Sequence, residues 1–291
     1  MLRAVSQRRS QSVQDRTAAR NDMNQDIFDR HRVRLAGCSE APDVLVFTHG
    51  LGTDQSVWDG VAHALGRDFR TLTYDNAGAA PCNQTYFRAN QARYLNVSGY
   101  ASDLLAIVDA AVPEGRVSLV GHSVGGMASL LAALKRPRFF HRLVMIGSSP
   151  RYMDDGDYRG GFTRADIDAV YGALSSDYAS AVQHIAALMT GDENSRFAGR
   201  FAEVMLKTPP DMMLTTLCAV LQGDRRKDLH QVAVPTLLLQ SAADAFVPLP
   251  VAEYMQGQIP GSVLRVIEAS GHLPHVTAPE AVVEAIRDFL S

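Results

Sequence analysis

Residues 117–127 combine a candidate nucleophile with the local pattern that would expose it. An apolar, β-branched run ends in Gly-His-Ser-Val-Gly, and a helical pattern over 128–136 follows at once. A G-x-S-x-G turn between a strand and a helix holds its serine in strained backbone geometry, with the hydroxyl exposed. Gly121 and Gly125 let the strand and the helix approach closely. An ordinary turn is the alternative, but the flanking pattern favours Ser123 as a nucleophile.

His272 is the candidate general base. A serine hydroxyl is a weak nucleophile and needs an adjacent base, which in this arrangement follows it in the chain. His272 lies in Glu-Ala-Ser-Gly-His, directly after a predicted strand over 263–267. His275 is a rival, but Gly271 gives His272 the tight turn that such a loop needs. His122 lies inside the turn of the nucleophile and is expected to face away from it.

Asp244 is the candidate acid that orients the base. It lies just past the predicted strand 235–240, and functional loops of open α/β sheets gather at this end of the strands. Its role would be to hold the imidazole in one tautomer and to stabilise the imidazolium formed during attack. Three other acidic residues also lie between Ser123 and His272 in the chain, namely Asp224, Asp228 and Glu253. They fall on predicted helices or helix ends, where a solvent-exposed charge is the better interpretation.

Two backbone amides, those of Val124 and Leu51, are predicted to bind a developing oxyanion. Such a charge needs preorganised N–H donors. One donor is the residue after the nucleophile, and the other comes from the loop Thr-His-Gly-Leu-Gly at 48–52. Leu51 is the candidate in that loop because the flanking glycines let backbone amides turn towards the site.

The length and composition of the chain are typical of one large α/β domain, and they give no sign of a highly charged binding partner. The chain has 291 residues, of which 46% are hydrophobic and 20% charged, with a net charge of −3. This balance gives no basis for binding nucleic acid or an anionic membrane, and no apolar run is long enough to span a bilayer. The three cysteines are far apart, which favours a reducing compartment over disulfides or metal ligation. We expect a cytoplasmic protein with no metal and no cofactor.

Residues 1–26 differ from the rest of the chain. They are rich in Arg, Ser and Gln and carry almost no large apolar side chains, so we expect a disordered extension. A secretory signal would need an apolar segment that is absent. An organellar transit peptide is an alternative, and a misassigned start upstream of Met23 is the favoured explanation.

The remainder alternates strand and helix patterns, which predicts a mainly parallel sheet flanked by helices. Strands are predicted at 27–36, 43–48, 70–74, 117–120, 142–147, 235–240 and 263–267. Helices are predicted near 57–65 and over 97–111, 128–136 and 278–290, and a long polar loop over 75–96.

From Ser149 onward the rhythm changes. Four segments carry apolar residues at helical spacing with no strand signal between them: 163–175, 177–190, 194–206 and 210–222. We therefore predict an α/β core over 27–150 and 223–291, into which a four-helix cap is inserted over 151–222.

Several motifs together resemble a narrow α/β-hydrolase subfamily that contains the bacterial stress-signalling hydrolase RsbQ and the plant karrikin and strigolactone receptors. They are HGLGTDQSVW at 49–58, YDNAG at 74–78, GHSVGG at 121–126, SPRYMDDGDYRGGF at 149–162 and SGHLPH at 270–275. The resemblance runs from about residue 27 to the C-terminus. It implies a Ser123–Asp244–His272 triad under a V-shaped cap, and hydrolysis of a small apolar ester, enol ether or butenolide lactone.

The same resemblance indicates a substrate pocket. Tyr152 and Phe162 match the family pattern, and His49 is included as a substrate-binding candidate. Ile185 and Leu221 are aliphatic where family members often place Phe, and Leu51 also replaces a Phe, which implies a roomier pocket. The alternative for Ile185 and Leu221 is that they only pack the cap against the core.

Two functions follow from these residues. The first is a serine hydrolase that acts on a small apolar ester or lactone through an acyl-enzyme intermediate. The second is a ligand sensor with slow or single-turnover hydrolysis, which signals through a protein partner, as the resemblance implies for several members. Perhydrolase or C–C bond cleavage on the same triad stays open, whereas chemistry with an Asp nucleophile does not fit Ser123.

Overall fold

A seven-stranded sheet forms the centre of the computed structural model, which describes residues 22–112, 114–191 and 196–291. The strand order is β1-β3-β2-β4-β5-β6-β7, and every neighbouring pair is parallel except β1 with β3. The strands are β1 Arg34–Gly37, β2 Asp43–Thr48, β3 Arg70–Thr73, β4 Arg116–His122, β5 Phe140–Ile146, β6 Thr236–Ala243 and β7 Val263–Ser270. The predicted mainly parallel sheet is confirmed.

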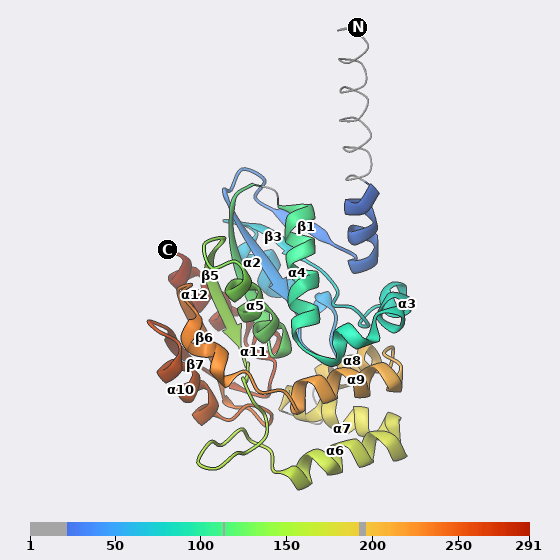
Figure 1. The fold of residues 1–291 in the computed structure, drawn as a ribbon. Coiled ribbons are helices and arrows are strands. Elements are labelled where there is room, and N and C mark those ends of the chain that lie inside the picture. The colour runs from blue at the N-terminus through green and yellow to red at the C-terminus, as the bar shows by residue number, and fades with distance from the viewer. Residues whose placement is uncertain (1–21, 113, 192–195) are drawn as a thin grey trace, which may run out of the picture.

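Helices cover both faces of this sheet (Figure 1). Helices α4 Ser98–Ala111, α5 Val124–Lys135 and α10 Leu249–Gln258 bury side chains in one core, and α2 Asp59–Leu65 and α12 Pro279–Leu290 do so in the other. In β2, Val44 and Val46 belong to the first core, whereas Leu45 and Phe47 belong to the second. Alternate side chains of a strand point to opposite faces, which explains why this strand is apolar on both faces from Val44 to Phe47. The short elements are η1 Gln55–Trp58, η2 Gln91–Leu95, η3 Arg226–Gln231 and α11 Pro274–Thr277.

Four helices lie between β5 and β6, inside the segment that we propose as a cap. They are α6 Arg164–Ser176, α7 Tyr178–Thr190, α8 Arg196–Met205 and α9 Pro210–Leu221, and Figure 1 shows them grouped below the sheet. Local signals explain several of their ends. Thr163 and Asp166 form a capping box before α6, Asp177 caps α7, and Gly191 ends α7 in the left-handed conformation at φ 73°.

The structure corrects two predictions near the N-terminus. Residues 22–31 are helical, so the predicted strand over 27–36 is wrong for its first half and only β1 remains. Ile27 and Phe28 pack against the first core from this helix. Residues 1–21, which hold most of the expected disordered extension, lie outside the described residues. Within the described part of the chain, no helix has the length and apolarity to cross a membrane.

The predicted loop over 75–96 is wrong as well, because it contains α3 Pro81–Ala89 and η2. Proline at the first helical position needs no N–H partner there. The buried Asn83 side chain organises the approach to α3: its oxygen accepts hydrogen bonds from the N–H groups of Gly78 (2.9 Å) and Ala80 (3.2 Å). Its nitrogen donates to the carbonyl of Asn76 at 3.0 Å. A short polar side chain can thus replace a backbone turn.

Asn83→Ala should lower the free energy of unfolding by about 2–4 kcal/mol. The reason is that three buried hydrogen bonds are lost, each worth roughly 1 kcal/mol, while their backbone partners stay desolvated. Urea unfolding measures this change. Thr85→Ala on the exposed side of α3 is the matched control and should stay within about 0.5 kcal/mol of the parent chain. Equal stability of the two variants would contradict the role given to Asn83.

Candidate active site

Ser123 stands in the turn between β4 and α5 with a backbone that few side chains adopt. Its φ is 54° and its ψ is −123°, a region that costs about 1–3 kcal/mol for a non-glycine residue. Its N–H donates to the carbonyl of Ile146 (2.8 Å), and its carbonyl accepts from the Ser148 hydroxyl (3.0 Å). These contacts to the end of β5 hold the predicted nucleophile in place.

Asp244 and His272 form a buried hydrogen-bonded pair. Nδ1 of His272 lies 2.8 Å from Oδ2 of Asp244. The carboxylate also accepts from the N–H groups of Phe246 (2.8 Å) and Val247 (3.1 Å) and from the Gln240 side chain (3.1 Å). A carboxylate so placed is an acceptor only, so Nδ1 carries a proton, and in the neutral ring Nε2 keeps its lone pair. A general base needs this tautomer.

The structure brings Ser123 and His272 to the same cavity. The serine hydroxyl lies 3.2 Å from the Tyr152 hydroxyl, and among the described residues it makes no hydrogen bond to His272. Hydrogen bonds between nucleophile and base are often long before substrate binds. Tyr152 is therefore in direct contact with the predicted nucleophile, which sequence reasoning did not anticipate.

The two residues of the oxyanion hypothesis both lie next to the candidate nucleophile site: Leu51 lines the cavity beside Ser123, and Val124 follows Ser123 in the chain. Val124 is the first residue of α5, and the first N–H groups of a helix have no partner within it. Neither amide has a hydrogen-bond partner in the described part of the chain. The helix N-terminus also carries partial positive charge, which favours an anion at this position.

His49 lies behind this loop and not in the cavity. Its Nδ1 donates to the carbonyl of Gly50 (2.8 Å), and its Nε2 accepts from the N–H of Asn76 (2.9 Å). The Asn76 side chain returns a hydrogen bond to the carbonyl of His49 at 2.8 Å. The buried ring thus fixes the loop that presents Leu51. Of the residues predicted to contact substrate, His49 is the one that does not line the cavity beside Ser123.

The cavity beside Ser123 has a volume of about 210 Å³ and is mostly apolar. The four other predicted pocket residues line it: Tyr152, Phe162, Ile185 and Leu221. Sequence reasoning missed several further lining residues, namely Met189, Met205, Met213, Leu217 and Phe246. Methionine at helical spacing is the usual composition of a buried helix face, so the sequence held no signal that separates these side chains from ordinary core.

Burial also sets the protonation of the polar groups around the site. It raises the pKa of the Tyr152 phenol above its ordinary value, so this hydroxyl is neutral and can donate.

Among the described residues no group of three or more His, Cys, Asp or Glu is arranged to hold a metal ion.

Two histidines beside the site are fully buried. Burial lowers the pKa of His122 well below its ordinary value, and the neighbouring His275 and His272 rings lower it further. Burial likewise lowers the pKa of His275 to about 3. The His275 ring stacks on Trp58 with centroids 4.4 Å apart, and neither of its nitrogens has a partner among the described residues. Both rings are therefore neutral at physiological pH.

The comparisons with known proteins agree with this geometry. Residues 45–285 match the model of the alpha/beta hydrolase family. The chain is 36% identical over 262 residues to a karrikin insensitive 2 receptor of Petunia hybrida, covering 89% of this chain and 95% of that protein. It is 35% identical over 271 residues to a strigolactone esterase of Pisum sativum, covering 92% of this chain and 100% of that protein. A solved hydrolase from Oleispira antarctica superposes with a TM-score of 0.86 at 29% identity, covering 92% of this chain and 97% of the other.

Stability should fall as the pH drops below about 6.5, because His275 takes a proton in the unfolded chain but not in the folded one. With a folded pKa of about 3, this loss continues down to about pH 3. One pKa unit corresponds to 1.36 kcal/mol, so the contribution of His275 at pH 5 is a loss of about 2 kcal/mol.

Urea unfolding of the parent and His275→Leu at pH 7.5 and pH 5 measures this contribution. The difference between the two pH values should be smaller by about 2 kcal/mol in His275→Leu. His230→Leu is the control, since that side chain is solvent-exposed. An identical pH dependence in parent and His275→Leu would contradict the neutral buried ring.

Proposed function

Because the chain belongs to the α/β-hydrolase family, in the group of the karrikin and strigolactone receptors, we propose that it hydrolyses a small apolar ester or lactone with Ser123 as nucleophile. The observation that carries this proposal is the juxtaposition of a strained Ser123 and the Asp244–His272 pair at one apolar cavity. Strained backbone of this kind persists where the surrounding structure enforces it, and it clusters at active sites.

In the acylation step, the Ser123 hydroxyl turns from Tyr152 towards Nε2 of His272 and attacks the substrate carbonyl. His272 takes the serine proton, and Asp244 stabilises the imidazolium that results. The amides of Leu51 and Val124 bind the oxyanion as it forms. His272 then gives its proton to the leaving alkoxide or enolate, and Ser123 carries the acyl group.

In the deacylation step, a water molecule loses a proton to His272 and attacks the acyl-enzyme. The second oxyanion forms at the same two amides, and its collapse returns the proton to Ser123. No redox chemistry or cofactor enters either step. The low polarity of the cavity strengthens these electrostatic contacts, because water is excluded from around them.

The cavity lining narrows the substrate class. Among the described residues that line the cavity, the polar side chains are Ser123, Tyr152, His184 and His272, and none is Lys, Arg, Asp or Glu. A charged acyl group would lose its hydration without gaining a partner, which is costly. Neutral, compact substrates are therefore favoured.

We further propose a cytoplasmic location, on the ground that all three cysteines are free thiols in the structure.

Ser123→Ala should abolish hydrolysis of p-nitrophenyl acetate, and Asp244→Asn should lower kcat by about 10⁴-fold because His272 would hold the wrong tautomer. Both rates are read from p-nitrophenolate release. Binding of a non-hydrolysed ligand, followed by its effect on Tm, should survive in Ser123→Ala. Comparable turnover by the parent and Ser123→Ala would refute the proposed nucleophile.

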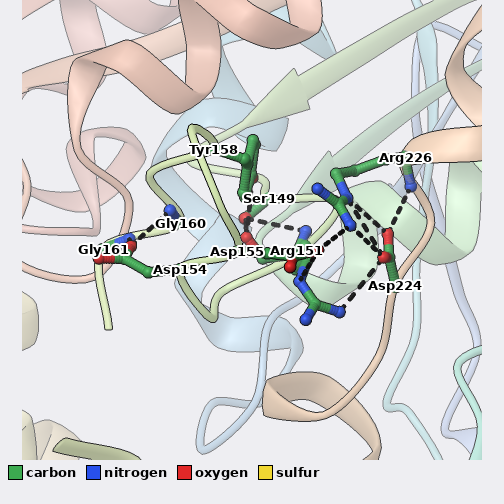
Figure 2. A network of polar contacts seen from close by, with 9 residues as sticks. All are labelled: Ser149, Arg151, Asp154, Asp155, Tyr158, Gly160, Gly161, Asp224 and Arg226. Carbon is green, nitrogen blue, oxygen red and sulfur yellow. Dashed lines mark hydrogen bonds and ion pairs between the residues drawn. The ribbon is translucent and has the colours of Figure 1, made fainter. Parts of the chain in front are cut away.

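A second candidate function is a ligand sensor, and one observation favours it. The two chain segments that join the proposed cap to the core are tied together by an ion network (Figure 2). Arg226 contacts Asp155 (2.6 Å) and Asp224 (2.7 Å), and Arg151 contacts Asp224 (3.2 Å). Arg151 is adjacent in the chain to Tyr152, whose hydroxyl reaches Ser123. Acylation of Ser123 would therefore be linked, through Tyr152 and Arg151, to both segments that join the proposed cap to the core. A protein partner would recognise the cap position that results.

The number of turnovers separates the two candidates. A metabolic esterase should release many equivalents of p-nitrophenol per chain at a constant rate. A sensor should release about one equivalent and then stall, with an acetyl group retained on the protein in its intact mass, because deacylation is the slow step and the acyl-enzyme accumulates. Sustained turnover with no retained acyl group would contradict the sensor.

A further inference from the structure

The peptide groups on both sides of the His272 Cα are held by different parts of the molecule. Its N–H donates to the carbonyl of Met189, in the last turn of cap helix α7, at 2.7 Å. Its carbonyl lies 2.8 Å from Nε2 of His122, in the turn of the nucleophile. A carbonyl can only accept, so Nε2 of His122 carries a proton and donates. The predicted base is therefore held between the proposed cap and the nucleophile turn.

His122 is built into this position. Its side chain is fully buried, and its ring lies 4.7 Å from the His272 ring between centroids. A Cβ atom at Gly50 would lie 2.6 Å from Nδ1 of His122, so the loop over 48–52, which we call the oxyanion loop after its proposed role, packs against the other edge of the ring. The ring thus connects the oxyanion loop, the nucleophile turn and the base, and it is not itself among the residues that line the cavity beside Ser123.

The cap side of this arrangement depends on two glycines. Gly191 and Gly271 both have positive φ, 73° and 86°. A Cβ at Gly191 would lie 2.7 Å from the nitrogen of Gly271, and one at Gly271 would lie 2.7 Å from the carbonyl oxygen of Met189. Two backbones approach this closely only where neither carries a side chain. The end of α7 and the His272 loop therefore make direct backbone contact.

We propose that His122 is a positioning residue for the general base, and that with the carbonyl of Met189 it makes the placement of His272 depend on the docked cap. This inference rests on the proposed function. Proton transfer requires the base to be within hydrogen-bond reach of the serine, and a displacement of about 1 Å can lower a rate by about 10²-fold. His122 acts on the base through its carbonyl and not on the substrate.

The test compares four variants with p-nitrophenyl acetate at pH 8. His122→Leu removes the donor, and His275→Leu is the matched control, because it removes a buried ring of the same cluster that makes no hydrogen bond to His272. His122→Gln carries an amide donor that reaches the place of Nε2. His122→Asn carries the same donor on a side chain too short to reach it.

We expect His122→Leu and His122→Asn to lose about 10²-fold in kcat with KM nearly unchanged. His122→Gln should recover most of this loss, and His275→Leu should stay close to the parent. The inference is overturned by parent-like kcat in His122→Leu or His122→Asn, or by equal losses in His122→Gln and His122→Asn. If His122→Leu does not fold, as judged by its melting curve, the comparison of Gln with Asn decides.

Gly191→Ala tests the cap side independently. Its added methyl would push α7 away from the His272 loop, so kcat should fall about tenfold or more. Gly172→Ala in α6 is the matched control, because nothing lies within 4 Å of the methyl that it adds. Equal kcat in these two variants would overturn the dependence on the cap. A different result would refute the proposed function itself: the parent chain would show no turnover that depends on Ser123.

Discussion

Close packing of backbone around the nucleophile turn is the constraint on which the rest of the site depends. A Cβ at Gly121 would lie 2.5 Å from the carbonyl oxygen of Gly125, and one at Gly125 would lie 2.5 Å from that of His49. Strand β4, helix α5 and the end of β2 therefore meet at distances that only glycine permits. This packing holds Ser123 at φ 54°, and it brings the oxyanion loop beside the first N–H groups of α5.

Around this centre, buried polar side chains replace backbone turns. Asn83 closes the turn that leads into α3, and its side-chain nitrogen donates to the Asn76 carbonyl. Asn76 in turn holds the backbone and ring of His49, whose Nδ1 holds Gly50. The chain of contacts ends at the Leu51 amide. Buried hydrogen-bond networks with all members satisfied specify one arrangement, so the position of that amide depends on residues that do not line the cavity beside Ser123.

The sequence predicted the order of strands and helices well where patterns were long. β2, β4 and the four helices between β5 and β6 follow from apolar runs and helical spacing. The helix that ends at His31 and α3 were missed because short polar segments carry little periodicity, and the decisive contacts are tertiary. The Asp244–His272 pair was foreseeable from chain order. The Tyr152 contact with Ser123 was not, since it depends on how the loop before α6 folds back.

The proposed cap has two roles that no pattern in the sequence connects. It supplies most of the apolar lining of the cavity, and through Met189 it holds the backbone of His272. A helix that only covered a pocket could be displaced without consequence for the base. Here, displacement of α7 would break a hydrogen bond of the base itself, so opening the cavity and disabling proton transfer are one event. An esterase would use this coupling to confine hydrolysis to the closed state. In a sensor the same coupling would act in the opposite direction: acylation of Ser123 would change how favourably the cap docks on the core.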